Sequence, residues 1–205
     1  MNTVVIKDDD FSYAVSVLLG GGLVGLPTET VYGLAGNGFD ASAVQKIYEV
    51  KGRPAIKPLI LLVADIAVAE TLCAEMPEEA RLLAGAFWPG PLTLVLPRRG
   101  IVPDIVTSGG DTVGVRCPNH PKTLEFLRLA GVPAAAPSAN MSGQPSPKNA
   151  QDVLAYFDGK IECVIDGGQC VLGFESTIVD LTTAPYRIIR RGALPEEEIE
   201  RVLCR

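Results

Sequence analysis

The sequence is poor in the residues that build the commonest catalytic and metal sites. It contains a single histidine, His120, and its five cysteines are scattered without a Cys-x-x-Cys pair. A Ser-His-Asp triad or a cysteine-rich zinc site is therefore not expected. The cysteines are predicted to be buried or incidental thiols. His120 lies at the expected start of a helix and is predicted to be a capping or surface residue rather than a base.

Long apolar runs are also missing, and a signal peptide is not expected from the first residues. No run approaches the roughly 18 residues that a membrane helix needs, and residues 1–10, MNTVVIKDDD, carry acids where a signal peptide has basic and apolar parts. Hydrophobic residues make up 47% of the 205 residues, which suits a folded chain with a sizeable core. Because no repeat or linker interrupts the chain, we expect one domain over residues 1–205, located in the cytoplasm and without membrane contact.

The net charge of −6 argues against a protein that coats nucleic acid, because neutralisation of phosphates dominates such binding. The cations are nevertheless unevenly distributed. They gather at residues 46–57, 98–99, 116 and 187–191. If these stretches converge in the fold, an acidic protein can still hold a strongly positive pocket.

Residues 26–59 are the stretch around which the chain is organised. The apolar run at 23–26 predicts a buried strand, and its end delivers the polar side chains of residues 28–30. A helix is predicted from its N-cap Asp40 to about Val50. It ends at Lys51-Gly-Arg53-Pro, with Lys57 close behind, so three cations follow one helix and favour an anion nearby.

Glycines at 33, 36 and 38 follow the first strand. Their spacing does not match the Gly-x-Gly-x-x-Gly pattern of a dinucleotide-binding loop, and no Walker lysine and hydroxyl follow them. We therefore interpret them as turn glycines.

The rest of the chain alternates between strand and helix patterns, which is typical of an α/β protein with ligands at its strand ends. Further strands are predicted at 59–63, 92–96, 111–116, 132–136, 162–165, 176–181 and 185–191, and further helices at 11–19, from 65, from 77, and at 121–130, 149–157 and 195–203.

Four strand or helix ends share one chemical character, since they offer hydroxyl, amide and cationic groups without a metal-ligand cluster. Such groups suit an anion held by hydrogen bonds, for example an amino acid, a nucleotide or both. The four groups are Thr28 and Thr30; Lys51 and Arg53; Ser138, Asn140 and Ser146; and Ser176, Thr177 and Arg190.

Six segments spread over most of the chain carry a more specific signal. They are PTETVYGL at 27–34, KGRP at 51–54 with KPL at 57–59, VGVRCP at 113–118, PSAN at 137–140, SGQPSP at 142–147 and ESTIVD at 175–180. Together they resemble the YrdC family, the threonylcarbamoyl-AMP synthases.

The resemblance implies an α/β domain with a twisted mixed sheet, flanked by helices around a deep positively charged cavity. It also implies that L-threonine, bicarbonate or CO₂, and ATP are joined into L-threonylcarbamoyladenylate with release of pyrophosphate. Mg²⁺ would bind mainly through the ATP phosphates. The product would pass to a separate tRNA threonylcarbamoyl transferase complex, so contact with tRNA is expected to be weak or indirect.

The resemblance further implies roles for single residues, with no metal ligand among them. Lys51, Arg53, Ser138 and Asn140 would act at the reacting centre. Thr30, Arg116, Ala136 and Ser176 would surround threonine, with Arg116 on its carboxylate. Arg53, Lys57, Thr112, Ser138, Ser146 and Arg190 would hold ATP. The labile intermediate requires shelter from water, so the loop at 141–149 or the KGRP segment is predicted to act as a lid.

Two departures from the family pattern and two rival functions complete the expectations. Some longer members have a histidine where this chain has Leu62, and they continue beyond Arg190-Arg191-Gly192 into a further domain that is expected to be absent here or supplied otherwise. The rivals are a non-catalytic RNA-binding module of the same fold, and a paralogue that binds the ligands with weak or no turnover.

Overall fold

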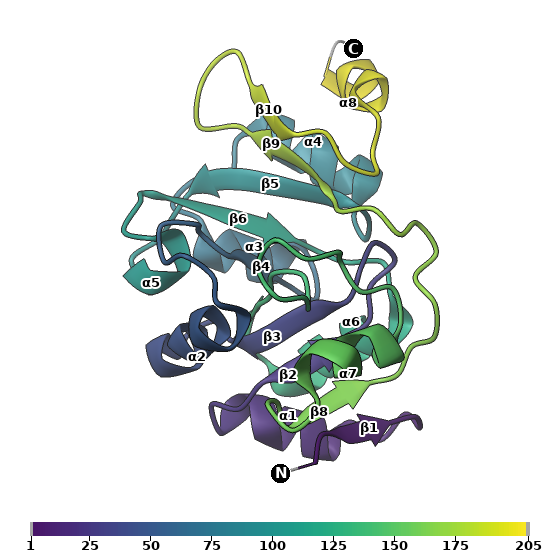
Figure 1. The fold of residues 1–205 in the computed structure, drawn as a ribbon. Helices are drawn as coiled ribbons and strands as arrows, with labels where there is room; N and C mark the ends of the chain where they lie inside the picture. Colours follow the sequence, from purple (N-terminus) through teal and green to yellow (C-terminus); the bar gives the residue numbers. More distant parts are fainter. Residues whose placement is uncertain (1, 204–205) are drawn as a thin grey trace.

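Ten strands form one mixed sheet in the computed structural model, which describes residues 2–203. The strand order is β1-β8-β2-β3-β7-β4-β6-β5-β9-β10, with β1 and α8 at opposite ends of the molecule (Figure 1). Neighbouring strands run parallel in the pairs β1/β8, β2/β8, β4/β6 and β5/β9, and antiparallel in the other five pairs. The mixed α/β sheet expected from the sequence is thus confirmed.

The strands are β1 (Val4–Ile6), β2 (Val24–Leu26), β3 (Gly33–Asn37), β4 (Ile60–Leu62), β5 (Leu92–Pro97), β6 (Thr112–Arg116), β7 (Ala134–Ala135), β8 (Cys163–Ile165), β9 (Thr177–Asp180) and β10 (Arg187–Arg190). The helices are α1 (Ser12–Leu19), α2 (Ala41–Lys51), α3 (Ile66–Leu72), α4 (Glu78–Phe87), α5 (Asp104–Thr107), α6 (Pro121–Ala130), α7 (Ala150–Phe157) and α8 (Glu196–Leu203). No helix between residues 2 and 203 is long and apolar enough to cross a membrane.

Successive residues of the central strands face two different apolar clusters, as the two-residue period of a strand requires. In β4, Leu61 packs in one cluster and Leu62 in the other, and in β8 Val164 and Ile165 divide in the same way. Helices therefore cover both faces. In Figure 1, α3 and α4 lie behind the strands and α7 lies in front of them.

Local sequence explains why α2 ends in a turn at Lys51-Gly52-Arg53. The Asp40 side chain accepts a hydrogen bond from the Ser42 amide and caps the start of the helix. Gly52 ends it in the left-handed conformation, with φ of 58°, which glycine adopts without steric cost. The helix therefore stops at Lys51, and the chain reverses before Arg53.

The interpretation of the three glycines as turn residues is confirmed for Gly38, which lies in a turn directly after β3, and was wrong for the other two. Gly33 and Gly36 lie in strand β3, which pairs with β2 and β7. A β-carbon on Gly36 would lie 3.2 Å from both Leu23 and Ile47, and one on Gly38 would lie 2.8 Å from the Pro133 carbonyl oxygen. The glycines are there because neighbouring chain packs against the backbone, which a single sequence does not reveal.

The other elements that the sequence did not predict, β1 and α5, are short. The predicted strands and helices are present with small differences at their ends, which are the least certain part of any sequence-based assignment. The strand predicted at 132–136 is only two residues long, and Pro133 directly precedes it. Proline lacks the backbone donor that a longer ladder would need.

We expect Gly38→Ala to lower the free energy of unfolding by about 1–3 kcal/mol, because the new methyl group overpacks against Leu61 and the Pro133 carbonyl. Gly85→Ala is the matched control. Gly85 lies on the exposed side of α4, and no atom lies within 4 Å of the place that an added methyl group would occupy, so alanine there should stabilise by about 0.5–1 kcal/mol. Urea unfolding followed by circular dichroism measures both; equal effects of the two substitutions would contradict the packing argument.

Candidate functional site

A cavity of about 150 Å³ lies where several strand and loop ends meet. Its walls come from the turn after β2, the loop after α2, the end of β6, the turn after β7, the start of β9 and the end of β10. Seven of the residues to which the family resemblance gives a role line it, namely Thr30, Arg53, Arg116, Ala136, Ser138, Ser176 and Arg190, and Thr28 lies beside them. The structure thus brings together side chains from segments as far apart in sequence as residues 30 and 190.

Hydroxyl groups at one wall are held by a tight turn. Thr28 Oγ1 donates to the Val31 carbonyl at 2.6 Å and accepts from the Thr30 and Val31 amides at 3.2 Å each. Thr30 Oγ1 lies 2.8 Å from the Thr28 hydroxyl. Both threonines are buried, so the turn satisfies its own polar groups while Thr30 stays at the cavity wall.

Arg116, at the end of β6, is buried and paired with an acid. Its Nε donates to the Gly90 carbonyl at 3.1 Å, and its Nη2 lies 2.8 Å from Oε2 of Glu29. This contact is an ion pair between two buried side chains. Burial lowers the pKa of Arg116, and the charge of Glu29 opposes that shift. The guanidinium stays charged because its ordinary pKa is very high.

Ser176 and Arg190 form a second polar group in the cavity lining. Arg190 Nη2 donates to the Ser176 hydroxyl at 3.0 Å, and Arg190 Nε donates to the Ser176 carbonyl at 2.9 Å. The same hydroxyl lies 2.8 Å from that of Thr93 in β5. Pairing of β5 with β9 and of β9 with β10 brings these three residues together.

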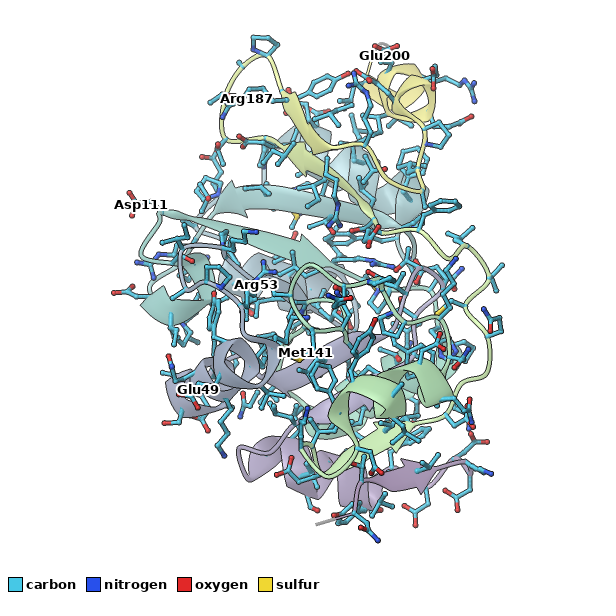
Figure 2. All side chains as sticks on the ribbon, in the orientation of Figure 1. Glu49, Arg53, Asp111, Met141, Arg187 and Glu200 are labelled. Atoms are coloured by element: carbon cyan, nitrogen blue, oxygen red, sulfur yellow. The ribbon has the colours of Figure 1, made fainter. Side chains whose placement is uncertain are left out.

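Arg53 shapes its own loop. Its Nε donates to the Lys57 carbonyl at 3.2 Å, and its Nη2 donates to the Pro58 carbonyl at 2.9 Å. Figure 2 shows Arg53 near the middle of the view, close to the loop that carries Met141, whereas Glu49 projects from α2 at the margin. The guanidinium lines the cavity, and its partners are neutral carbonyl groups.

Lys51 and Asn140 do not line the cavity. The buried amino group of Lys51 donates to the carbonyls of Ser138 and Asn140, the latter at 2.5 Å. The Asn140 side chain donates to the carbonyls of Met141 and Gln144. Burial, and next the charge of Arg53, lowers the pKa of Lys51 to about 7. The two residues therefore fix the loop that presents Ser138.

Three predicted nucleotide contacts also lie outside the lining. The Ser146 hydroxyl donates to Oε1 of Glu175 at 2.6 Å, and this bond, with the charges of Arg190 and Lys148, lowers the pKa of that carboxyl. Lys57 and Thr112 are exposed, on the loop after α2 and at the start of β6.

Sequence reasoning missed two acids. Glu175 lines the cavity, and Glu29 pairs with Arg116. Both stand inside motifs already singled out, PTETVYGL and ESTIVD, and their place directly beside predicted hydroxyl ligands is the signal that could have found them.

The prediction for His120 was wrong in part. It occupies the N-cap position of α6, but its half-buried ring makes no capping bond and packs against Gly167.

The cavity therefore combines three guanidinium groups with hydroxyl and backbone donors, and one carboxylate, that of Glu175, is part of its lining. Arginine forks match the oxygens of carboxylates and phosphates. The arrangement can hold an anionic ligand with more than one charged group.

We expect Lys51→Met to lower the free energy of unfolding by about 2 kcal/mol or more, because two carbonyl groups lose their donor. Folded Lys51 has a pKa of about 7 and unfolded lysine about 10.5, so the unfolded state binds more protons between these values. The difference in free energy of unfolding between the wild type and the variant should therefore grow from pH 7 to pH 10. Denaturant titrations over this range measure this difference, with the exposed Lys7→Met as control. An equal loss of unfolding free energy at every pH would contradict the lowered pKa of the buried amino group.

Comparison with known proteins adds to this geometry. The Sua5/YciO/YrdC family, described as "Telomere recombination", matches residues 16–192. The threonylcarbamoyl-AMP synthase of Pyrococcus abyssi is 53% identical over 97% of this chain and 58% of its own length. That of Bacillus subtilis is 44% identical over 96% of this chain and 57% of its own length. The chain thus spans less than two thirds of the length of these relatives.

A solved structure shows the same fold. The crystal structure of P. abyssi Sua5 complexed with L-threonine superposes with a TM-score of 0.96 at 49% identity, over 99% of this chain and 61% of that one. The motifs, the sheet and these relatives agree with one another over nearly the whole sequence. This chain belongs to the Sua5/YciO/YrdC family.

Proposed function

We propose that this chain catalyses the synthesis of L-threonylcarbamoyladenylate from L-threonine, bicarbonate or CO₂, and ATP, with release of pyrophosphate. One observation carries the proposal: seven residues predicted from the motifs line a single cavity. Relatives named threonylcarbamoyl-AMP synthase, at 53% and 44% identity, support it. So does the threonine complex of the related Sua5 structure.

Arg116, Thr30, Ala136 and Ser176 would hold the amino acid in this proposal. A buried guanidinium suits a carboxylate, and the small side chain of Ala136 leaves room beside it. The amine and CO₂ form a carbamate with loss of a proton. A cavity that excludes water slows the return of this labile group to the free amine.

Arg53, Ser138 and Arg190 would hold the nucleotide, with Ser146, Lys57 and Thr112 at its margins. A carbamate oxygen attacks the α-phosphorus, a new P–O bond forms, and the bond to pyrophosphate breaks. Negative charge then grows on the phosphate oxygens, where Arg53 is proposed to stabilise it. Lys51 and Asn140 would contribute by fixing the Ser138 loop.

Mg²⁺ enters this proposal on the phosphates of ATP. Within residues 2–203, no three His, Cys, Asp or Glu side chains gather in a group that could hold a metal ion. The protein residues therefore do not fit a metal centre of their own, and no step above is routed through one.

The place in the cell and the partners complete the proposal. The adenylate is an activated carbamoyl donor, so an enzyme that transfers the carbamoyl group to tRNA must consume it. We propose a cytoplasmic location with weak or indirect contact to tRNA. The overall charge of −6 agrees with weak RNA affinity and gives no support to an RNA-binding module.

Pyrophosphate release should require L-threonine and bicarbonate together with ATP. A coupled pyrophosphate assay in which each substrate is omitted in turn measures this requirement. Release with ATP alone, or equal release with serine and threonine, would contradict the proposed reaction. Calorimetric binding of threonine and ATP without any product would identify a paralogue that has lost turnover.

Arg53→Lys should lower kcat about 10²-fold, because lysine keeps the charge but loses the planar fork. The variant should still melt cooperatively, since the Arg53 partners all lie in its own loop. Arg81→Lys, on exposed α4, serves as the control and should leave kcat unchanged. A wild-type kcat in the Arg53→Lys variant would contradict a role for Arg53 at the reacting centre.

A further inference from the structure

The carboxylate of Glu29 is buried beside the cavity, and its charged partner in the described chain is Arg116. Five buried polar side-chain atoms lack a hydrogen-bond partner in the described part of the chain, and four of them belong to Glu29, Arg116 and His120. Buried polar groups are nearly always hydrogen-bonded, so such a cluster calls for an explanation. Glu29 stands between Thr28 and Thr30, which both line the cavity.

The contacts of Arg116 show how Glu29 acts on it. Gly90 accepts from Nε, and Glu29 faces Nη2 at 2.8 Å. Among residues 2–203 no protein group accepts from Nη1, while Arg116 lines the cavity. Two arms of the fork are thus fixed by the protein, and the third is free for a ligand oxygen.

The three cavity arginines differ in the charge of their partners. Arg53 contacts backbone carbonyls, and Arg190 contacts the hydroxyl and carbonyl of Ser176, all of which are neutral groups. Arg116 alone of the three contacts a carboxylate within ion-pair distance in the described chain. Glu175 also lines the cavity, and its charge acts on Arg190. The attraction for anions is therefore strongest near Arg53 and weakest near Arg116.

We propose that Glu29 is a positioning and specificity-determining residue. It orients Arg116 and cancels its charge. This end of the cavity therefore takes the carboxylate of a net-neutral amino acid and rejects a phosphate group. The identity of that amino acid as threonine rests on the proposed function. The argument from the charges of Glu29 and Arg116 is independent of the proposed function.

Geometry alone would not separate the two kinds of ligand. A guanidinium fork matches a carboxylate and a phosphate equally well. A phosphate carries up to two negative charges, whereas an amino acid at neutral pH is a zwitterion with none. A bare arginine therefore favours the phosphate, and a neutral arginine–glutamate pair removes that preference. Without Glu29 the triphosphate of ATP could occupy the amino-acid end.

Glu29→Gln tests the proposal because it removes the charge and keeps the shape. Its apparent dissociation constant for L-threonine, measured by calorimetry in the presence of inorganic phosphate, should rise about tenfold relative to the wild type because phosphate now competes for Arg116; this rise is equivalent to ~1.4 kcal/mol. Inorganic phosphate should raise its melting temperature more than that of the wild type. Glu29→Asp keeps the charge and should match the wild type toward phosphate. Glu162→Gln is the control, since this carboxylate accepts only from the Leu23 amide, remote from the cavity lining.

The Glu29→Gln/Arg116→Gln double variant assigns the effect to the ion pair. It should lose the extra phosphate response and regain part of the melting temperature lost in Glu29→Gln, because no buried charge is left uncompensated. Equal phosphate responses of the Gln and Asp variants would overturn the proposal, as would an unchanged threonine affinity of Glu29→Gln in the presence of phosphate.

Failure of the proposed function gives a different result. If the wild type binds no threonine, that function fails, while the phosphate comparison among the variants still supports or overturns the role of Glu29. Should Glu29→Gln not fold, a double variant that folds supports charge compensation. A double variant that also fails to fold assigns Glu29 a structural role.

Discussion

The buried amino group of Lys51 is the contact on which the cavity depends. It joins the last residue of α2 to the backbone carbonyls of Ser138 and Asn140 in the turn after β7. The Ser142 amide completes the link by donating to the Lys51 carbonyl at 2.9 Å. Two segments almost ninety residues apart are thereby locked together, and Ser138 and the Arg53 loop face the same space. An exposed lysine would gain little from such bonds, whereas a buried one cannot leave them without a large desolvation cost.

Charge compensation divides this space into two ends. At one end the positive charge of Arg116 is balanced by Glu29. At the other, Arg53 and Arg190 donate to neutral acceptors, and the charge of Glu175 also acts on Arg190. The sum of the charges says little about this difference, because a chain with a net charge of −6 still brings three arginines together in one cavity. The positions of two carboxylates, Glu29 beside Arg116 and Glu175 in the lining, leave Arg53 as the arginine that attracts anions most strongly.

Sheet register is what makes the hollow possible. The pairing of β5 with β9 and of β9 with β10 sets Thr93, Ser176 and Arg190 in contact, and the pairing of β4 with β6 sets Arg116 beside the end of β4. A shift of one residue would turn these side chains to the opposite face. The site therefore depends on packing across the whole sheet.

Much of the molecule could be predicted from the amino-acid sequence by itself. Periodicity and caps predicted most strands and helices, and the motifs predicted seven residues that line one cavity, because these signals lie within short stretches of chain. Other features were decided by tertiary structure alone. Close packing against the backbone accounts for Gly33 and Gly36 in strand β3. Burial keeps Lys51 out of the cavity lining, and the fold brings Glu29 within ion-pair distance of Arg116. Each of these depends on contacts between distant segments, and such contacts exist only once the sheet has brought those segments together.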